Sequence, residues 1–156
     1  MPEKFKLTTE TTTTPWGTKL YRIKALIDFA SVSKGDLGGW IEKAENLDQD
    51  GDAWVYGNAL VSGNARVYGD ALVYGDAAIL WFSKVGSGLG TLTAFVDKAA
   101  NIILTRGCFI GTLAEFKTQV VKTHGETLHA QAYLKLADYI EFHFTVLHPI
   151  ELKEAA

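Results

Sequence analysis

A six-residue repeat in the middle of the chain limits the possible fold more than any other feature of the sequence. Its recurring residues are Gly51, Gly57, Gly63, Gly69 and Gly75, then Val55, Val61, Val67 and Val73, and finally Ala53, Ala59, Ala65, Ala71 and Ala77. An α-helix is excluded, because glycine and valine are poor helix formers and a period of six places the valines on no single helical face. The alternation within each unit predicts extended strands, and the Gly-Asn and Gly-Asp pairs predict the turns between them.

The array resembles the hexapeptide repeat of left-handed parallel β-helices, in which three hexapeptides form one triangular coil. The resemblance implies an inward aliphatic residue followed four places later by an inward small residue, as in Val55 and Ala59. With about eighteen residues in each coil, Leu37, Val55 and Val73 are expected to share one buried column. We therefore predict a short β-helix over residues 36–83.

The first coil of this predicted β-helix, "DLGGWIEKAENLDQ", is degenerate. The eighteen-residue register pairs Ile41 with Ala59, Leu47 with Ala65, and Gly51 with Gly69. Lys43 and Gln49 stand at positions where the repeat would place valine. Such departures are expected in the terminal units of a repeat array, because these units cap the stack.

The segments on either side of the array predict two different structures. Residues 1–35 alternate in "KFKLTTETTTT" and "TKLYRIKAL" around the turn "PWG", so we expect a hairpin cap over the open strand edge. Residues 84–156 are expected to form an α+β lobe with a short sheet and two helices. The first helix has a Thr112–Glu115 capping box and a left-handed stop at Gly125, and the second begins near Thr127. The expected fold is mostly β with this C-terminal α+β lobe.

Composition narrows the class of protein. The 156 residues carry a formal net charge of −3 and show no basic run, which disfavours nucleic-acid binding. A single cysteine excludes an intramolecular disulfide and fits a reducing compartment. Neither a signal peptide nor a long apolar run is evident, so we expect no membrane partner and a cytoplasmic location.

Most of residues 20–140 resembles small hexapeptide-repeat proteins of tailed bacteriophages and prophages of enteric bacteria. The stretches that carry the resemblance are "YRIKALIDF", "GDLGGWIEKAENLDQDGDAWVYG", "GTLTAF" and "RGCFIGTLAEFKTQVVKTHG". The resemblance implies a phage accessory protein in the cytoplasm of the bacterial host. It implies no particular activity.

Catalysis is not expected from this chain. Left-handed β-helix acyltransferases commonly use a histidine base on a coil loop, but the four histidines, His124, His129, His143 and His148, all follow the array. Without a general base an acceptor hydroxyl is not activated. The array also lacks the histidines that a metal-dependent hydration enzyme would need. We therefore expect no catalytic residue, no metal and no cofactor, with a divergent acyltransferase as the remaining enzyme hypothesis.

The strongest candidate for a ligand site lies in the C-terminal lobe, where Arg106, the helix start after Thr112, and Lys84 offer positive charge and free amides. Cys108 and His124 flank the same helix and are candidate members of the site. As a catalytic pair they are disfavoured, because a helix of about eleven residues separates them by roughly 16 Å. The simpler interpretations are a core cysteine, a helix-capping histidine, and an arginine paired with Glu115. A site at this lobe junction would suit a nucleotide or another phosphorylated molecule.

Aromatic residues of the array provide a second candidate surface. If the valines and alanines point inward, five aromatic side chains stand at outward or corner positions: Trp54, Tyr56, Tyr68, Tyr74 and Trp81. The register stacks Tyr56 beside Tyr74. Such residues either anchor protein interfaces or pack beneath the C-terminal lobe. We expect a homo-oligomer, a trimer before a dimer, and a non-enzymatic protein that inhibits a host antiphage factor or, alternatively, sequesters a nucleotide.

Overall fold

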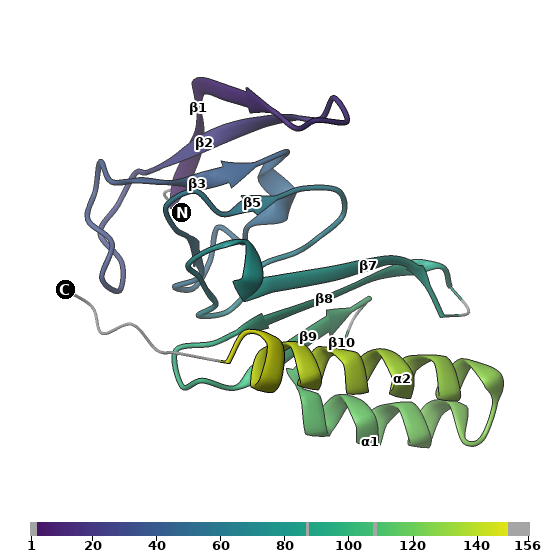
Figure 1. Ribbon diagram of the computed structural model, residues 1–156. Helices are drawn as coiled ribbons and strands as arrows, with labels where there is room; N and C mark the ends of the chain where they lie inside the picture. Colours follow the sequence, from purple (N-terminus) through teal and green to yellow (C-terminus); the bar gives the residue numbers. More distant parts are fainter. Residues whose placement is uncertain (1–2, 87, 108, 150–156) are drawn as a thin grey trace. The chain divides into compact units, whose positions relative to one another are not determined.

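The computed structural model describes residues 3–86, 88–107 and 109–149, and the chain divides after Asp76 into two compact units. Figure 1 shows the strands of the N-terminal unit and the sheet and helices of the C-terminal unit. Within the described ranges, no helix is long and apolar enough to cross a membrane.

The N-terminal unit begins with the predicted hairpin. Strand β1 (Phe5–Thr13) pairs antiparallel with β2 (Lys19–Ala25), and the turn between them contains Gly17 at a φ of 95°. Strand β3 (Leu37–Ile41) joins the other edge of β2, and β5 (Leu60–Val61) follows, which gives the order β1-β2-β3-β5. The hairpin is therefore part of a sheet that continues into the repeat.

The strands of the repeat form short parallel pairs. Strand β4 (Trp54–Val55) pairs with β6 (Leu72–Val73), so that Val55 lies opposite Val73 and both are fully buried. This confirms the predicted column for these two valines. Four repeat glycines have positive φ, as the predicted turns require: Gly51, Gly57, Gly63 and Gly69.

The eighteen-residue register is wrong in the first coil as far as Leu47, whereas Gly51 lies against Gly69 as predicted. Ile41 pairs with Val61 and Leu47 bridges to Val67, both with an offset of twenty residues. The reason is a two-residue insertion, because Leu47 and Val55 are eight positions apart where the repeat has six. Leu37 consequently lies outside the predicted column and is 53% exposed.

The array is also shorter than predicted. Parallel pairing ends at Val73, and the segment Ile79–Val85 (β7), most of which lies within the predicted β-helix, pairs antiparallel with β8 (Gly90–Val96). The repeat contributes paired strands of two residues and two short 3-10 helices, η1 (Ala44–Asn46) and η2 (Asp76–Ala78). The described residues thus form a mostly β fold of mixed and antiparallel sheets without a closed solenoid.

The C-terminal unit contains an antiparallel sheet with the order β10-β9-β8-β7. Its remaining strands are β9 (Ile102–Arg106) and β10 (Phe109–Thr112). Gly107, at a φ of 59°, lies in the turn between them.

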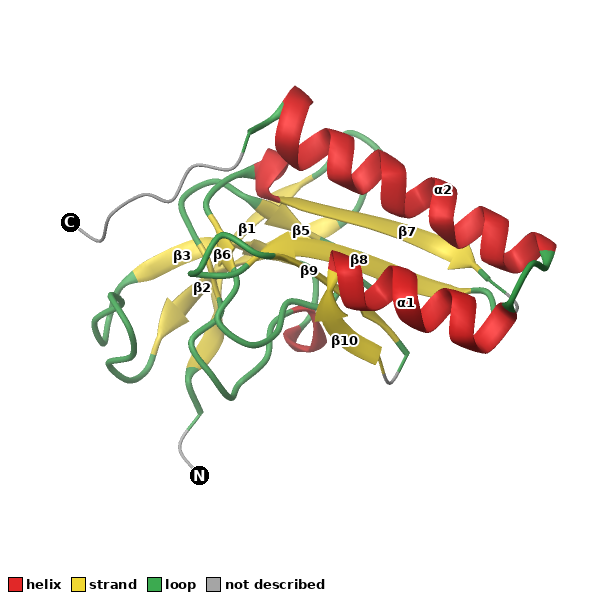
Figure 2. Ribbon diagram, turned by 90° about the horizontal axis from the view of Figure 1, so that it is seen from below, coloured by secondary structure: helices red, strands yellow, loops and turns green. Residues whose placement is uncertain are grey.

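Two helices cover one face of this sheet (Figure 2). Helix α1 (Leu113–His124) has the predicted capping box, and α2 (Leu128–Phe142) is capped by Thr127. The stop at Gly125 has φ 60° and ψ −122°, so its φ is positive but it is not in the predicted left-handed helical conformation. A π-helical turn, η3 (His143–Leu147), extends α2.

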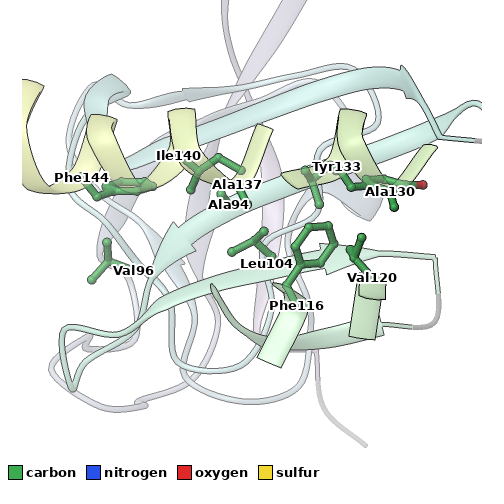
Figure 3. Packing of buried hydrophobic residues seen from close by; sticks show 11 residues of the cluster. Ala94, Val96, Leu104, Phe116, Val120, Ala130, Tyr133, Ala137, Ile140 and Phe144 are labelled. Carbon is green, nitrogen blue, oxygen red and sulfur yellow. The ribbon is translucent and has the colours of Figure 1, made fainter. Parts of the chain in front are cut away.

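The core of the C-terminal unit lies between the helices and the sheet. Strands contribute Leu92, Ala94, Val96 and Leu104, and helices contribute Phe116, Val120, Ala130, Tyr133, Ala137, Ile140 and Phe144. Figure 3 shows the Phe116 ring between α1 and the sheet, and its centroid lies 5.6–5.7 Å from those of Phe109 and Tyr133. The buried helical residues recur at the spacing of one packed face on each helix.

The segment that contains the two-residue insertion forms hydrogen bonds with residues Lys4 and Phe5. The Gln49 side chain accepts hydrogen bonds from the Lys4 and Phe5 amides at 2.8 and 3.2 Å. The Lys4 ammonium donates to the carbonyls of Ala53 and Gly51 at 2.8 and 3.3 Å, and the residue is only 1% exposed. Gln49, which departs from the repeat, therefore fixes the N-terminal segment.

The Lys4 site predicts a specific pH dependence. Burial lowers the pKa of Lys4 from 10.5 to about 8, against the opposing charges of Asp48, Asp52 and Asp50. Between these pH values the unfolded chain binds more protons than the folded chain, so the free energy of unfolding rises with pH. The stability of the wild type relative to Lys4→Met should therefore increase by about 3 kcal/mol between about pH 7.5 and 10.5.

Urea unfolding across this pH range measures the effect. The exposed Lys6 provides the matched control, since Lys6→Met removes the same charge from the same end of the chain. The difference between the wild type and Lys6→Met should stay nearly constant with pH. An equally constant difference for Lys4→Met would contradict the buried position of its ammonium group.

Candidate functional site

Arg106, the central residue of the predicted ligand site, lies at the end of β9 beside the β7–β8 turn. Its Nη2 donates to the carbonyl of Val85 at 3.1 Å, and its Nε is buried without a hydrogen-bond partner among the described residues. A Cβ at Gly90 would lie only 2.6 Å from the guanidinium. Arg106 therefore packs over the turn. The predicted alternative of an ion pair with Glu115 is wrong, since the guanidinium of Arg106 donates to Val85 and Oε1 of Glu115 accepts from the Thr112 amide, with no ion pair between these two described residues.

No hydrogen bond joins Arg106 to another of the predicted ligand residues in the described part of the chain. The His124 ring packs against the Tyr133 ring, with centroids 5.6 Å apart, and the Tyr133 hydroxyl lies against Gly86. Thr112 pairs with Ile103, three residues before Arg106 in β9, which places it about 10 Å away along the strand.

The two other members of the predicted site add no ligand geometry. Lys84 is exposed at the end of β7, where its φ of 60° accompanies a register shift against β8. Cys108 lies outside the described residues. Arg106 therefore packs on the β7–β8 turn, apart from the helix start at Thr112.

The aromatic side chains of the array divide into three groups. Trp54 is 1% exposed beneath the rings of Phe5 and Phe29, so its predicted outward position is wrong. Its place in the sequence carried no signal for this burial, because the covering rings come from the N-terminal 35 residues. Tyr56 and Tyr74 stack as predicted, with ring centroids 4.5 Å apart, and burial raises the pKa of Tyr74.

The remaining aromatic candidates are only partly exposed. Tyr68 accepts a hydrogen bond from Nη1 of Arg66 at 2.7 Å. Trp81 alternates along β7 with Leu80 and Phe82, which pack against the helices, so Trp81 lies on the opposite face of the sheet.

A polar groove in the N-terminal unit lies outside the sites that the sequence predicts. It has a volume of about 300 Å³ and is lined by Lys43, Glu45, Asn64, Ala65 and Arg66. The Lys43 ammonium donates to Oδ1 of Asn64 at 2.8 Å, and thereby links the first coil to the second. The eighteen-residue register placed Lys43 at a valine position, whereas the observed twenty-residue register makes it equivalent to Gly63 at a turn, so the sequence pattern did not point to this groove.

The outer face of α2 and η3 carries an apolar stripe that consists of Tyr139, Phe142, Val146 and Leu147. These side chains are 46–58% exposed. Tyr139 also contacts Phe82 at its edge, with ring centroids 6.0 Å apart. The helical spacing of the buried residues on α2 identifies its packed face, whereas no sequence pattern pointed to the stripe on the other side.

The histidines do not form a metal site in the part of the chain that the structure describes. No group of three or more histidine, cysteine or acidic side chains is placed to hold an ion among these residues. His143 is buried, and its Nε2 lies 2.8 Å from the carbonyl of Ala77. Because an N–H must donate to a carbonyl, the proton of this imidazole lies on Nε2, and the histidine ties η3 to the start of the C-terminal unit.

Comparison with known protein families gives no match for this chain, and neither does a comparison with curated proteins. The geometry of the two surfaces, the polar groove and the apolar stripe, therefore carries the functional argument.

Proposed function

We propose that this protein is a non-enzymatic binding protein that docks on a partner protein through the apolar stripe. The observation that supports the proposal is the exposure of Tyr139, Phe142 and Val146 on one helical face, at positions i, i+3 and i+7. Aromatic and aliphatic anchors at this spacing are typical of a helix that inserts into a groove of its partner. Contiguous apolar patches on a protein surface commonly mark interaction sites.

The size of the stripe favours a grooved partner over a second copy of this chain. Four large side chains at about half exposure offer roughly 400 Å², whereas a standard interface buries about 800 Å² on each partner. Packing against the helix of a second copy would cover little beyond the stripe. A groove also covers the flanks of the helix and can reach the required area.

The flank of the stripe defines the chemistry of the partner. Asp138 and Glu141 lie on this flank, and Lys117 approaches them at 4.0 and 3.2 Å and offsets part of their charge. A partner groove with an apolar floor and a basic rim would complement this surface. In a phage accessory protein, such a partner would be a protein of the bacterial host, and the role proposed for this chain is its inhibition.

The repeat supports the proposed protein type and oligomeric state. Under this proposal, residues 36–76 are a degenerate left-handed parallel β-helix of the phage hexapeptide-repeat type, present in the host cytoplasm. The stacked pair Tyr56 and Tyr74 is then the proposed contact of a homo-oligomer, with a trimer favoured. Sedimentation of the purified protein at micromolar concentration tests this assembly, and a monomer would contradict it.

A double substitution tests the proposed function. Phe142→Ser with Val146→Ser should leave the fold intact, because both side chains are about half exposed. The partner is first isolated from bacterial cells with tagged wild-type protein and is then purified for calorimetry. We expect 1:1 binding by the wild type and at least about a tenfold weaker affinity for the double variant, since central anchors dominate such interfaces.

Val121→Ser is the matched control, because Val121 is 55% exposed on α1 and lies outside the stripe. This variant should bind the partner as the wild type does. Equal affinity of the double variant and the wild type would refute the docking surface. Turnover of acyl-CoA by the purified wild type would instead support the alternative of a divergent acyltransferase.

A further inference from the structure

The polar groove lies where an irregular corner of the first coil meets a corner of the second coil. In the first coil the 3-10 turn η1 replaces a regular corner, and in the second coil residues 63–66 form the corresponding corner. Asn46 donates from its buried amide to the carbonyls of Gly63 and Ala65 at 3.1 and 2.9 Å. Glu42 accepts from the Gly63 amide at 2.9 Å. The groove therefore has a fixed backbone floor.

The charged side chains of the groove come from both coils. Lys43 and Arg66 contribute two positive charges and Glu45 one negative charge, so the lining is net positive in a chain whose formal net charge is −3. A local concentration of positive charge raises the local concentration of anions.

The polar groups of the groove differ in what they offer a ligand. Nη1 of Arg66 donates to the Tyr68 hydroxyl at 2.7 Å, and the planar shape of the guanidinium suits phosphate oxygens. Asn64 uses its amide oxygen for Lys43, so its amide nitrogen is the end that can donate to a ligand. Glu45 is an acceptor and suits a ligand hydroxyl.

We infer that this groove binds a small phosphate monoester that also carries hydroxyl groups. Lys43 and Arg66 would hold the phosphate, while Glu45 and Asn64 would contact the hydroxyls. The volume of about 300 Å³ is at the lower limit of ligand sites and fits a sugar phosphate or a mononucleotide. This ligand class matches the sequestration hypothesis, but the site lies within the N-terminal unit and not at the lobe junction.

The inference does not depend on the apolar stripe. All the lining residues belong to the N-terminal unit, whereas the stripe belongs to the C-terminal unit. A variant of the groove therefore leaves the proposed docking surface unchanged, and the Phe142 and Val146 substitutions leave the groove unchanged. Failure of one proposal is distinguishable from failure of the other.

Titration of the full-length protein with glucose 6-phosphate and AMP tests the inference. We expect binding to at least one of them with a dissociation constant below about 1 mM, and no binding of glucose. Amide chemical shifts of residues 43–46 and 63–66 should change on titration. The double variant Lys43→Gln with Arg66→Gln should weaken binding at least about tenfold.

A charge-matched control separates local binding from net charge. Lys6→Gln with Lys34→Gln removes two exposed positive charges of the same unit outside the groove, and it should bind as the wild type does. Equal weakening by both double variants would overturn the groove assignment, as would the absence of binding to both phosphate esters. Inorganic phosphate that binds as tightly as the esters would overturn the roles of Glu45 and Asn64.

Discussion

Val61→Asp should abolish folding of the N-terminal unit. Val61 is fully buried and pairs with Ile41 in the parallel β3–β5 ladder. A carboxylate at this position would have no positive partner among the valines and alanines of the repeat, and an unpaired buried charge costs several kcal/mol even after its pKa shifts. That cost is a large fraction of the roughly 5–15 kcal/mol that typically stabilises a whole domain.

Circular dichroism and amide exchange of the purified variant measure this outcome. Asn58→Asp is the control, because it introduces the same charge three residues earlier at an exposed turn position. The control should fold with a melting temperature within a few degrees of the wild type. A folded Val61→Asp protein with protected amides in β5 would show that the position is not part of a closed core.

The register of the array illustrates how far the sequence alone can be interpreted. The spacing of Val55 and Val73 predicted their pairing because no residue is inserted between successive repeats in this segment. The two extra residues between Leu47 and Val55 shifted the first coil from eighteen to twenty residues. A repeat period predicts the position of the next equivalent residue, but it does not predict where extra residues are inserted between two repeats.

The two irregular polar residues of the first coil show why the sites were harder to predict than the fold. The eighteen-residue register placed Gln49 and Lys43 at valine positions, whereas the observed register makes them equivalent to Gly69 and Gly63. Each makes a specific contact with a distant segment. Their partners, the Lys4 amide and Asn64, are 45 and 21 residues away. Local patterns do not encode such contacts.

The C-terminal unit was easier to predict because its signals are local. The Thr112–Glu115 capping box and the apolar spacing on α2 lie within single elements. Arg106 shows the limit of the same reasoning. Its charge and its position before a helix predicted an anion site. In the structure its guanidinium instead donates a hydrogen bond to the carbonyl of Val85, 21 residues earlier.

Asn46→Leu should destabilise the N-terminal unit by about 4 kcal/mol, because it leaves several buried polar groups without partners. Asn46 is fully buried, and its amide nitrogen donates to the carbonyls of Gly63 and Ala65. Its oxygen accepts from the Lys43 amide at 3.0 Å. Leucine is no smaller than asparagine, so the loss arises from the unpaired carbonyls and amide and not from a cavity.

Urea unfolding of three variants distinguishes the contribution of the Asn46 amide nitrogen to stability from that of its amide oxygen. Asn46→Asp keeps an acceptor for the Lys43 amide but loses both donors, and its negative charge faces two carbonyl oxygens, so it should be at least as destabilising as Asn46→Leu. Asn58→Leu, at an exposed turn, should change the free energy of unfolding by less than about 1 kcal/mol. If Asn46→Leu were as stable as the wild type, the amide would not link the two coils, and the floor of the polar groove would require another support.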